Sequence, residues 1–325
     1  MTAADGVGRS EGFKVGRLGA QRKSPMAKPI LPSNLSAEMP GGVAAARILE
    51  AKLRETQAFA EPALAGEVEG IHDLRVAAKR LREAMRLFRP LLPKRRGREL
   101  VTLVDQLNDP LGAVRDRDVL AGHAQAIREQ APESEAFIAG LQDLWAAERT
   151  ARFGEFTALW HRLMEAERLD RRLRELTAAI RKRQGLANEL PLDRFAYLSI
   201  RLRLQRVKSH LDRGGPQTAP AVLHRLRILV KRLKYGIEPF LPALPALEGP
   251  YGPVANVQEG LGLVHDFDVL HAAMSEFARR RRLKGGRAAL TRVAERRRAF
   301  LDAGRGKIEI IRSEAWQRSL LDSLD

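Results

Sequence analysis

Two stretches of the chain combine one histidine with several lysines and arginines at helical spacing. The first, IHDLRVAAKRLR, begins at Ile71, and the second, LHRLRILVKRLK, begins at Leu223. Arginine presents a planar fork of donors that matches oxyanions, and lysine presents a point charge. A neighbouring histidine can donate a further hydrogen bond, more strongly once an anion raises its pKa. This set of residue types is suited to phosphate groups.

On an α-helix, the apolar residues of each stretch gather on one face and the basic residues on the other. The expected core residues are Leu74, Ala78, Leu81, Met85 and Phe88 in the first stretch and Leu226, Leu229, Val230, Leu233, Ile237 and Phe240 in the second. The expected basic faces carry His72, Arg75, Lys79, Arg82 and Arg86 on the first helix and His224, Arg227, Lys231 and Lys234 on the second. The first basic face would be about 21 Å long, which favours a chain of phosphates over one small anion.

Solvated outer faces of bundle helices are the alternative interpretation of these basic residues. An ordinary solvated face mixes both signs of charge, whereas acidic residues are scarce on these two faces. Like charges one turn apart also repel, at a cost of a few tenths of a kcal/mol per pair. We therefore favour a binding role, and leave open a core or capping role for the two histidines.

The two stretches belong to an internal repeat. His72 and His224 are 152 positions apart, and a second motif follows each of them: LGAVRDRDVL from Leu111 and LGLVHDFDVL from Leu261. Two matches in the same order indicate a tandem duplication. We place the halves at residues 43–187 and 188–320.

The second motif favours a structural role. Gly112 and Gly262 would allow a break between helices. One aspartate of each pair, Asp116 and Asp266 or Asp118 and Asp268, would then cap the next helix or orient Arg75 and Arg227 by ion pairing. A metal site built from Asp116, Asp118 and His72 is disfavoured, because the ligand spacing is wrong and the flanking arginines repel cations. We predict no metal site.

The rest of the chain reads as amphipathic helices separated by proline and glycine clusters, with almost no strand signal. The fold class is therefore all-α. We expect four principal helices per half, near 43–60, 70–89, 95–130 (broken at the Leu-Gly motif) and 133–183, and near 193–212, 220–239, 251–283 (again broken) and 287–320.

Composition limits the possible functions. The chain has 57 Lys and Arg residues and 40 Asp and Glu residues, which gives a formal net charge of +17. We therefore expect the protein to bind anions and expect added salt to weaken that binding. There is no cysteine, which excludes disulfides and thiol chemistry. No apolar run approaches the roughly 20 residues of a membrane span. Residues 1–42 read as a flexible, mildly basic tail, and the expected location is the cytoplasm.

Together the two repeated motifs resemble the CHAD family (conserved histidine α-helical domain), over roughly residues 43–315. The resemblance implies two four-helix bundles related by pseudo-twofold symmetry around a basic central groove or pore. It implies inorganic polyphosphate as the ligand and, in some bacterial members, association with polyphosphate granules. By match, the binding residues would be His72, Arg75, Lys79, Arg82, His224, Arg227, Lys231 and Lys234.

The sequence contains no Walker-type loop, nucleophile elbow or paired-carboxylate cleft. We therefore expect a polyphosphate-binding module that is not an enzyme and needs no cofactor. Arg203 and Arg206, on the preceding helix, would extend the basic surface. The alternative is a nucleic-acid-binding protein with non-specific affinity, but aromatic residues make up only 5% and do not alternate with the basic residues. Oligomeric state and preferred chain length are not predicted.

Overall fold

A computed structural model describes residues 29–32, 34–164, 168–213 and 219–324. Within these ranges the chain is helical, and the one β-type contact is an isolated bridge between Pro40 and Pro191. The all-α prediction is confirmed. Residues 1–28 of the expected tail and the predicted break at 214–216 lie outside the described residues.

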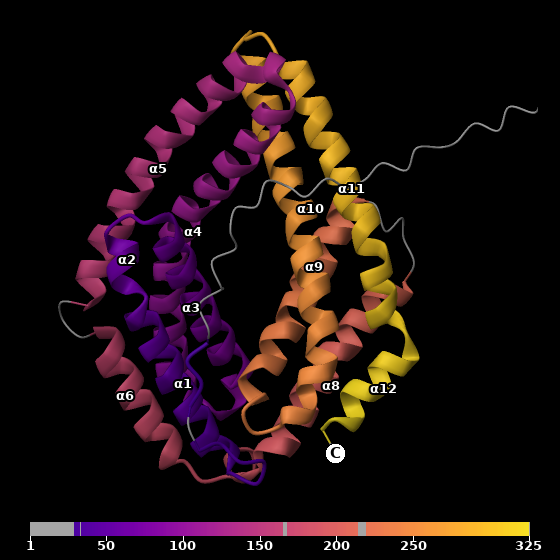
Figure 1. Cartoon of the computed structure of the whole chain (residues 1–325). Helices are drawn as coiled ribbons and strands as arrows, with labels where there is room; N and C mark the ends of the chain where they lie inside the picture. Colours follow the sequence, from indigo (N-terminus) through magenta and orange to yellow (C-terminus); the bar gives the residue numbers. More distant parts are fainter. Residues whose placement is uncertain (1–28, 33, 165–167, 214–218, 325) are drawn as a thin grey trace, which may run out of the picture.

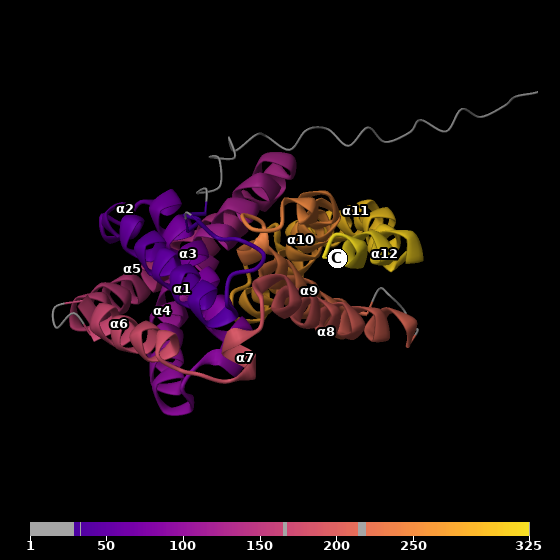
Figure 2. The same ribbon diagram turned by 90° about the horizontal axis from the view of Figure 1, so that it is seen from below.

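Figure 1 shows the helices in two groups that lie side by side. The first group contains α1 (Gly41–Ala58), α2 (Ala60–Leu64), α3 (Val68–Leu87), α4 (Lys94–Gln130), α5 (Glu135–Met164) and α6 (Arg168–Arg181). After the short α7 (Leu186–Glu189), the second group contains α8 (Leu192–Asp212), α9 (Pro220–Ile237), α10 (Glu248–Arg280), α11 (Gly286–Arg312) and α12 (Glu314–Asp322). The view from below separates the same two groups (Figure 2).

Two apolar junctions join the groups. At the lower end, Phe88 at the end of α3 stacks on Phe195 of α8, with ring centroids 5.5 Å apart, and meets Phe240 edge-on at 6.1 Å. At the apex, where α4 and α5 meet α10 and α11, Phe137 packs against Phe277 at 5.3 Å (Figure 1). Between these junctions α3 and α9 lie against each other, so the two predicted basic helices are neighbours.

A buried ion-pair network strengthens this attachment. Arg80 of α3 contacts Glu55 of α1 at 2.7 Å and Glu238, just after α9, at 2.6 Å. Glu55 also accepts a hydrogen bond from Lys52 (2.8 Å) and one from the backbone N–H of Ile30 (3.1 Å). The last part of the expected tail is therefore packed against α1 rather than free.

The predicted break at the Leu-Gly motif is wrong. Helix α4 runs unbroken from Lys94 to Gln130, through Pro110 and Gly112, and α10 is likewise continuous through Pro253. Local breakers are overruled here because the surrounding turns are held in the core, where Leu111 and Val114 are fully buried. Asp116, Asp118, Asp266 and Asp268 consequently lie inside helices and are not N-caps.

Two other predicted helices are divided. The predicted helix 133–183 corresponds to α5 and α6, with residues 165–167 between them outside the described part. The predicted helix 287–320 is divided at Ser313, whose hydroxyl accepts a hydrogen bond from the backbone N–H of Trp316 and so caps α12.

Candidate anion-binding site

The core faces of the two His-led helices are placed as predicted. Every expected core residue of α3 and α9 is buried, with Leu74, Leu81, Met85, Val230 and Leu233 at most 1% exposed. Helices α3 and α9 contact each other at the interface between the two helix groups, and the charges of Lys231 and Arg227 of α9 act on Lys79 of α3. The periodicity of the sequence therefore identified the correct faces.

Lys79 and Lys231 show how close the two basic faces are. Burial, with the positive charges of Arg75, Lys231 and Arg227, lowers the pKa of Lys79 to about 7. Burial also lowers the pKa of Lys231 to about 8; Glu83 opposes this, and Arg82 and other cations add to it. Each lysine is thus influenced by cations of the other helix, and a nearby anion would restore its charge.

One aspartate of the second motif contacts an arginine of the first. Asp116 Oδ1 accepts a hydrogen bond from Arg75 Nη1 at 2.7 Å, which confirms that ion pair. In the second half, burial raises the pKa of Asp266 to about 6, and the charge of Arg227 acts in the opposite direction. Asp116 and Asp266 belong to α4 and α10. The sequences of the two basic helices therefore do not contain these acidic residues.

Asp118 and Asp268 have a different role. Asp118 accepts a hydrogen bond from Arg149 of α5 at 2.6 Å, and Asp268 accepts one from Arg297 of α11. Each therefore ties the motif helix to the helix that follows it. The sequence left open which aspartate of each motif has which role. In the structure the first aspartate of each motif lies toward the basic helices, and the second pairs with an arginine of the following helix.

His72 and His224 lie at one end of the basic faces, where His72 is partly buried and His224 is exposed. Burial, followed by the charges of Arg115 and Lys79, lowers the pKa of His72 to about 4. In the second half, His224 Nδ1 lies 3.5 Å from His265 Nδ1, and burial with the charge of Arg227 lowers the pKa of His265 to about 4. At neutral pH His72 and His265 are uncharged and can donate or accept hydrogen bonds.

Arg115 and His265 were not predicted as site residues. They occupy the same place in the repeated motif, directly before Asp116 and Asp266. A basic residue at this place in both copies was the signal that sequence reasoning passed over.

Of the remaining predicted residues, Arg82 and Arg86 lie at the interface and Lys234 does not. Arg82 and Arg86 stay at the interface but share carboxylates, with Arg82 3.4 Å from Asp105 and Arg86 3.0 Å from Glu83. Lys234 is only 9% exposed, and its Nζ donates a hydrogen bond to Gln258 of α10 at 2.9 Å. Lys234 is therefore turned toward its own helix group and is not brought together with Lys79 and Lys231.

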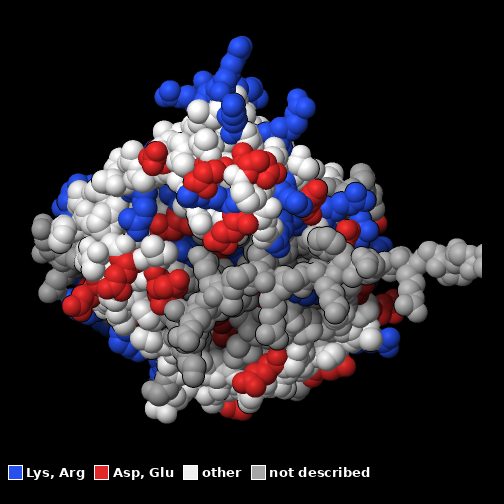
Figure 3. Space-filling view, turned by 45° about the horizontal axis from the view of Figure 1, so that its top comes forward, with Lys and Arg blue, Asp and Glu red and all other residues white. Residues whose placement is uncertain are grey.

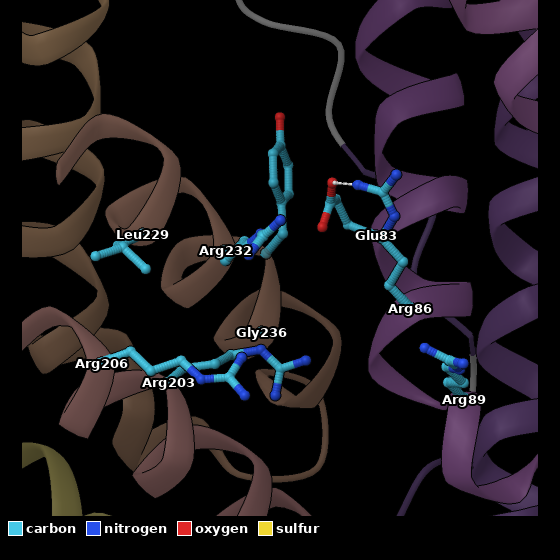
Figure 4. A pocket seen from close by; sticks show the side chains of 9 residues that line it. Glu83, Arg86, Arg89, Arg203, Arg206, Leu229, Arg232 and Gly236 are labelled. Atoms are coloured by element: carbon cyan, nitrogen blue, oxygen red, sulfur yellow. Dashed lines mark hydrogen bonds and ion pairs between the residues drawn. The ribbon is translucent and has the colours of Figure 1, made fainter. Parts of the chain in front are cut away.

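A cavity of about 300 Å³ lies at the lower end of the basic faces. Its lining residues come from both helix groups and are Glu83, Arg86, Arg89, Arg203, Arg206, Leu229, Arg232, Tyr235 and Gly236. Figure 4 shows arginines projecting into it from opposite sides. Arg203 and Arg206 were expected to extend the basic surface, whereas Arg89 and Arg232 were missed.

A second concentration of positive charge lies at the apex. Arg279, Arg280, Arg281, Arg282 and Lys284 are all exposed there, and basic side chains project from this end in Figure 3. Among the described residues, no group of three or more His, Asp or Glu side chains could hold a metal ion. No helix in that part of the chain has the length and apolar character to cross a membrane.

Comparison with known proteins identifies the family. The family model described as "CHAD domain" matches residues 47–275. The chain belongs to the CHAD domain family. A search of curated proteins gave no match. Among solved structures, the CHAD domain from the plant Ricinus communis aligns with a TM-score of 0.66 and 23% identity, over 86% of this chain and 95% of that one.

A second solved structure shares the fold of this CHAD chain. PptA from Streptomyces chartreusis aligns with a TM-score of 0.60 and 16% identity, over 84% of this chain and 99% of that one. Both likenesses extend over most of the described helices, so the arrangement in Figure 1 is the fold of these proteins as well.

Proposed function

We propose that this CHAD domain protein binds inorganic polyphosphate, without catalysis, between the basic faces of α3 and α9. The observation that carries the proposal is the contact between α3 and α9, the two helices of one repeated motif. Cations of the opposite helix contribute to the depressed pKa values of Lys79 and Lys231. Asp116, Asp105 and Glu83 pair with some of these cations. The remaining excess of positive charge favours an external polyanion. We further propose that the two helix groups are related by a pseudo-twofold axis through this interface.

Hydrogen-bond donors in the interface support an oxyanion ligand. The Nε atoms of Arg75, Arg82 and Arg227 are buried and have no hydrogen-bond partner within the protein. Buried donors of this kind are normally satisfied. Phosphate oxygens arranged along α3 and α9 would accept these hydrogen bonds and neutralise the charges at once.

A competition assay tests the ligand class. Labelled long-chain polyphosphate is bound and then challenged with DNA, RNA or tripolyphosphate at matched phosphate equivalents. We expect unlabelled polyphosphate to displace the label at much lower concentration than DNA or RNA does. Equal displacement by DNA would support the alternative, a nucleic-acid-binding protein, and association with polyphosphate granules would then lose its basis.

A pair of charge reversals tests the location. Lys79→Glu with Lys231→Glu should weaken polyphosphate binding by at least about a hundredfold and make it less sensitive to salt. The matched control, Lys208→Glu with Lys284→Glu, changes net charge equally at two exposed sites. If both pairs weaken binding alike, the ligand responds to overall charge and not to the α3–α9 interface.

A further inference from the structure

The internal repeat allows the arginine-lined cavity to be compared with the set of residues at the repeat-related positions. Pro40 and Pro191 cap α1 and α8 and are 151 positions apart, whereas α3 and α9 are offset by 152. Helix α1 packs on α3 as α8 packs on α9. The cavity residues Arg203, Arg206, Arg232 and Arg86 therefore correspond to Lys52, Glu55, Arg80 and Glu238.

The counterpart set is closed and neutral. Lys52, Glu55, Arg80 and Glu238 are each at most 6% exposed and form the network described above, with two cations and two carboxylates in contacts of 2.6–2.8 Å. Burying charges is costly unless they are paired. In this network, the protein itself supplies the anions.

In the cavity, both carboxylates are replaced by arginines. Arg206 stands where the repeat has Glu55, and Arg86 stands where it has Glu238. Arg89 adds a fifth cation, and Glu83 is the one acidic residue among the described residues that line the cavity. Glu83 is already 3.0 Å from Arg86. Unlike the buried network, Arg86, Arg89, Arg206 and Arg232 are exposed. The cavity is therefore open to solvent, and its excess positive charge is accessible to an external anion.

The cavity is shaped around one of these arginines. Arg203 crosses α9 at Gly236, where a β-carbon would lie 2.6 Å from its Cδ and 2.8 Å from its Nε. Arg203 Nη1 also donates a hydrogen bond to the backbone oxygen of Ser199 at 2.8 Å. Glycine weakens a helix relative to alanine, but here it leaves room for the Arg203 side chain (Figure 4).

The position of the cavity indicates which part of a polyphosphate chain it receives. It lies where the basic face of α3 ends, at Arg86 and Arg89, and next to it Phe88, Phe195 and Phe240 close the interface with packed rings. A chain that follows the basic faces in this direction cannot continue between the helices. Terminal phosphates carry up to two negative charges, like phosphomonoesters, whereas internal ones carry one.

We propose that the cavity is a terminal-phosphate site, in which guanidinium groups of both helix groups bind one end of a polyphosphate chain. The inference rests on the proposed function, because the rest of the chain would lie along α3 and α9. It adds a preference for free chain ends and a direction in which the chain is bound.

The test compares short polyphosphate of one defined length with the same chain whose two terminal phosphates are blocked as phosphoramidates. Wild-type protein should bind the free-ended chain about tenfold more tightly, since charge-assisted contacts are lost on blocking. In the variant Arg203→Gln/Arg206→Gln/Arg232→Gln, the two chains should bind equally. The control Arg201→Gln/Lys208→Gln/Arg225→Gln removes the same charge from exposed positions of α8 and α9 and should keep the tenfold difference.

Gly236→Ala offers a test without a change of charge. It should reduce the preference for free ends, because Arg203 must leave its place, while binding of the blocked chain stays at the wild-type level. In phosphorus NMR, the terminal resonance of the free-ended chain should broaden or shift first with wild-type protein. Equal binding of free and blocked chains by wild-type protein would overturn the terminal site alone, whereas failure to bind either chain would overturn the proposed function.

Discussion

Polyphosphate binding should weaken with rising pH, because Lys79 and Lys231 lose their protons near neutrality in the free protein. Their pKa values are about 7 and about 8. A bound polyanion raises both values toward the usual range of lysine, so the complex takes up protons that the free protein has lost. The internal phosphates of a long chain remain ionised throughout, so the lysines dominate the linkage.

The magnitude follows from the two pKa values. Between about pH 7 and about pH 8 the two lysines together lack on average roughly one proton in the free protein, so the dissociation constant should increase about tenfold over this interval. Replacing both residues by arginine keeps them charged at every pH in this range. The Lys79→Arg/Lys231→Arg variant should therefore show little pH dependence over the same interval.

Isothermal titration calorimetry in two buffers of different ionisation enthalpy measures both the affinity and the number of protons taken up. At about pH 7.5 the wild-type protein should take up roughly one proton more than the double arginine variant. Identical proton uptake and identical pH dependence in the two proteins would refute the claim that these lysines meet the ligand.

Three further predictions concern the interface and its supports. Lys79→Met should stabilise the free protein by about 1–2 kcal/mol below pH 7 and by less toward pH 10. A lysine whose folded-state pKa is depressed destabilises the fold at every pH at which it is charged. Chemical denaturation measures the free energy of unfolding, and an unchanged midpoint below pH 7 would contradict the prediction. Glu238→Gln should lower the free energy of unfolding by about 3 kcal/mol or more, because it leaves Arg80 without one of its two buried carboxylates. A decrease of less than about 1 kcal/mol would show that the network is dispensable. Asp116→Asn should free Arg75 for the ligand. Polyphosphate should then bind more tightly at low salt, and its affinity should fall more steeply as salt is added. Unchanged affinity would argue against competition between Asp116 and the ligand for Arg75.

Much of the site could be predicted because it depends on helical periodicity. A spacing of three and four residues places Leu74 and Leu81 in the core and Arg75 and Lys79 opposite them, whatever the neighbours are. The repeat then shows that a second helix carries the same faces. The family and the all-helical fold follow from the same two motifs.

The parts that failed depend on packing between segments distant in sequence. Pro110 and Gly112 are local signals for a break, and only the buried neighbours of α4 explain why the helix continues. Lys234 lies on the basic side in projection but is turned to Gln258 by the position of α10. Arg232 becomes a cavity residue because a second helix group faces it, and no local pattern contains that information.

The most direct test of the central claim is a crystal structure of the protein with a short polyphosphate chain. We expect one chain between α3 and α9, with phosphate oxygens within hydrogen-bond distance of both Lys79 and Lys231. A chain bound instead across the exposed arginines at the apex, with no phosphate near these two lysines, would contradict the account.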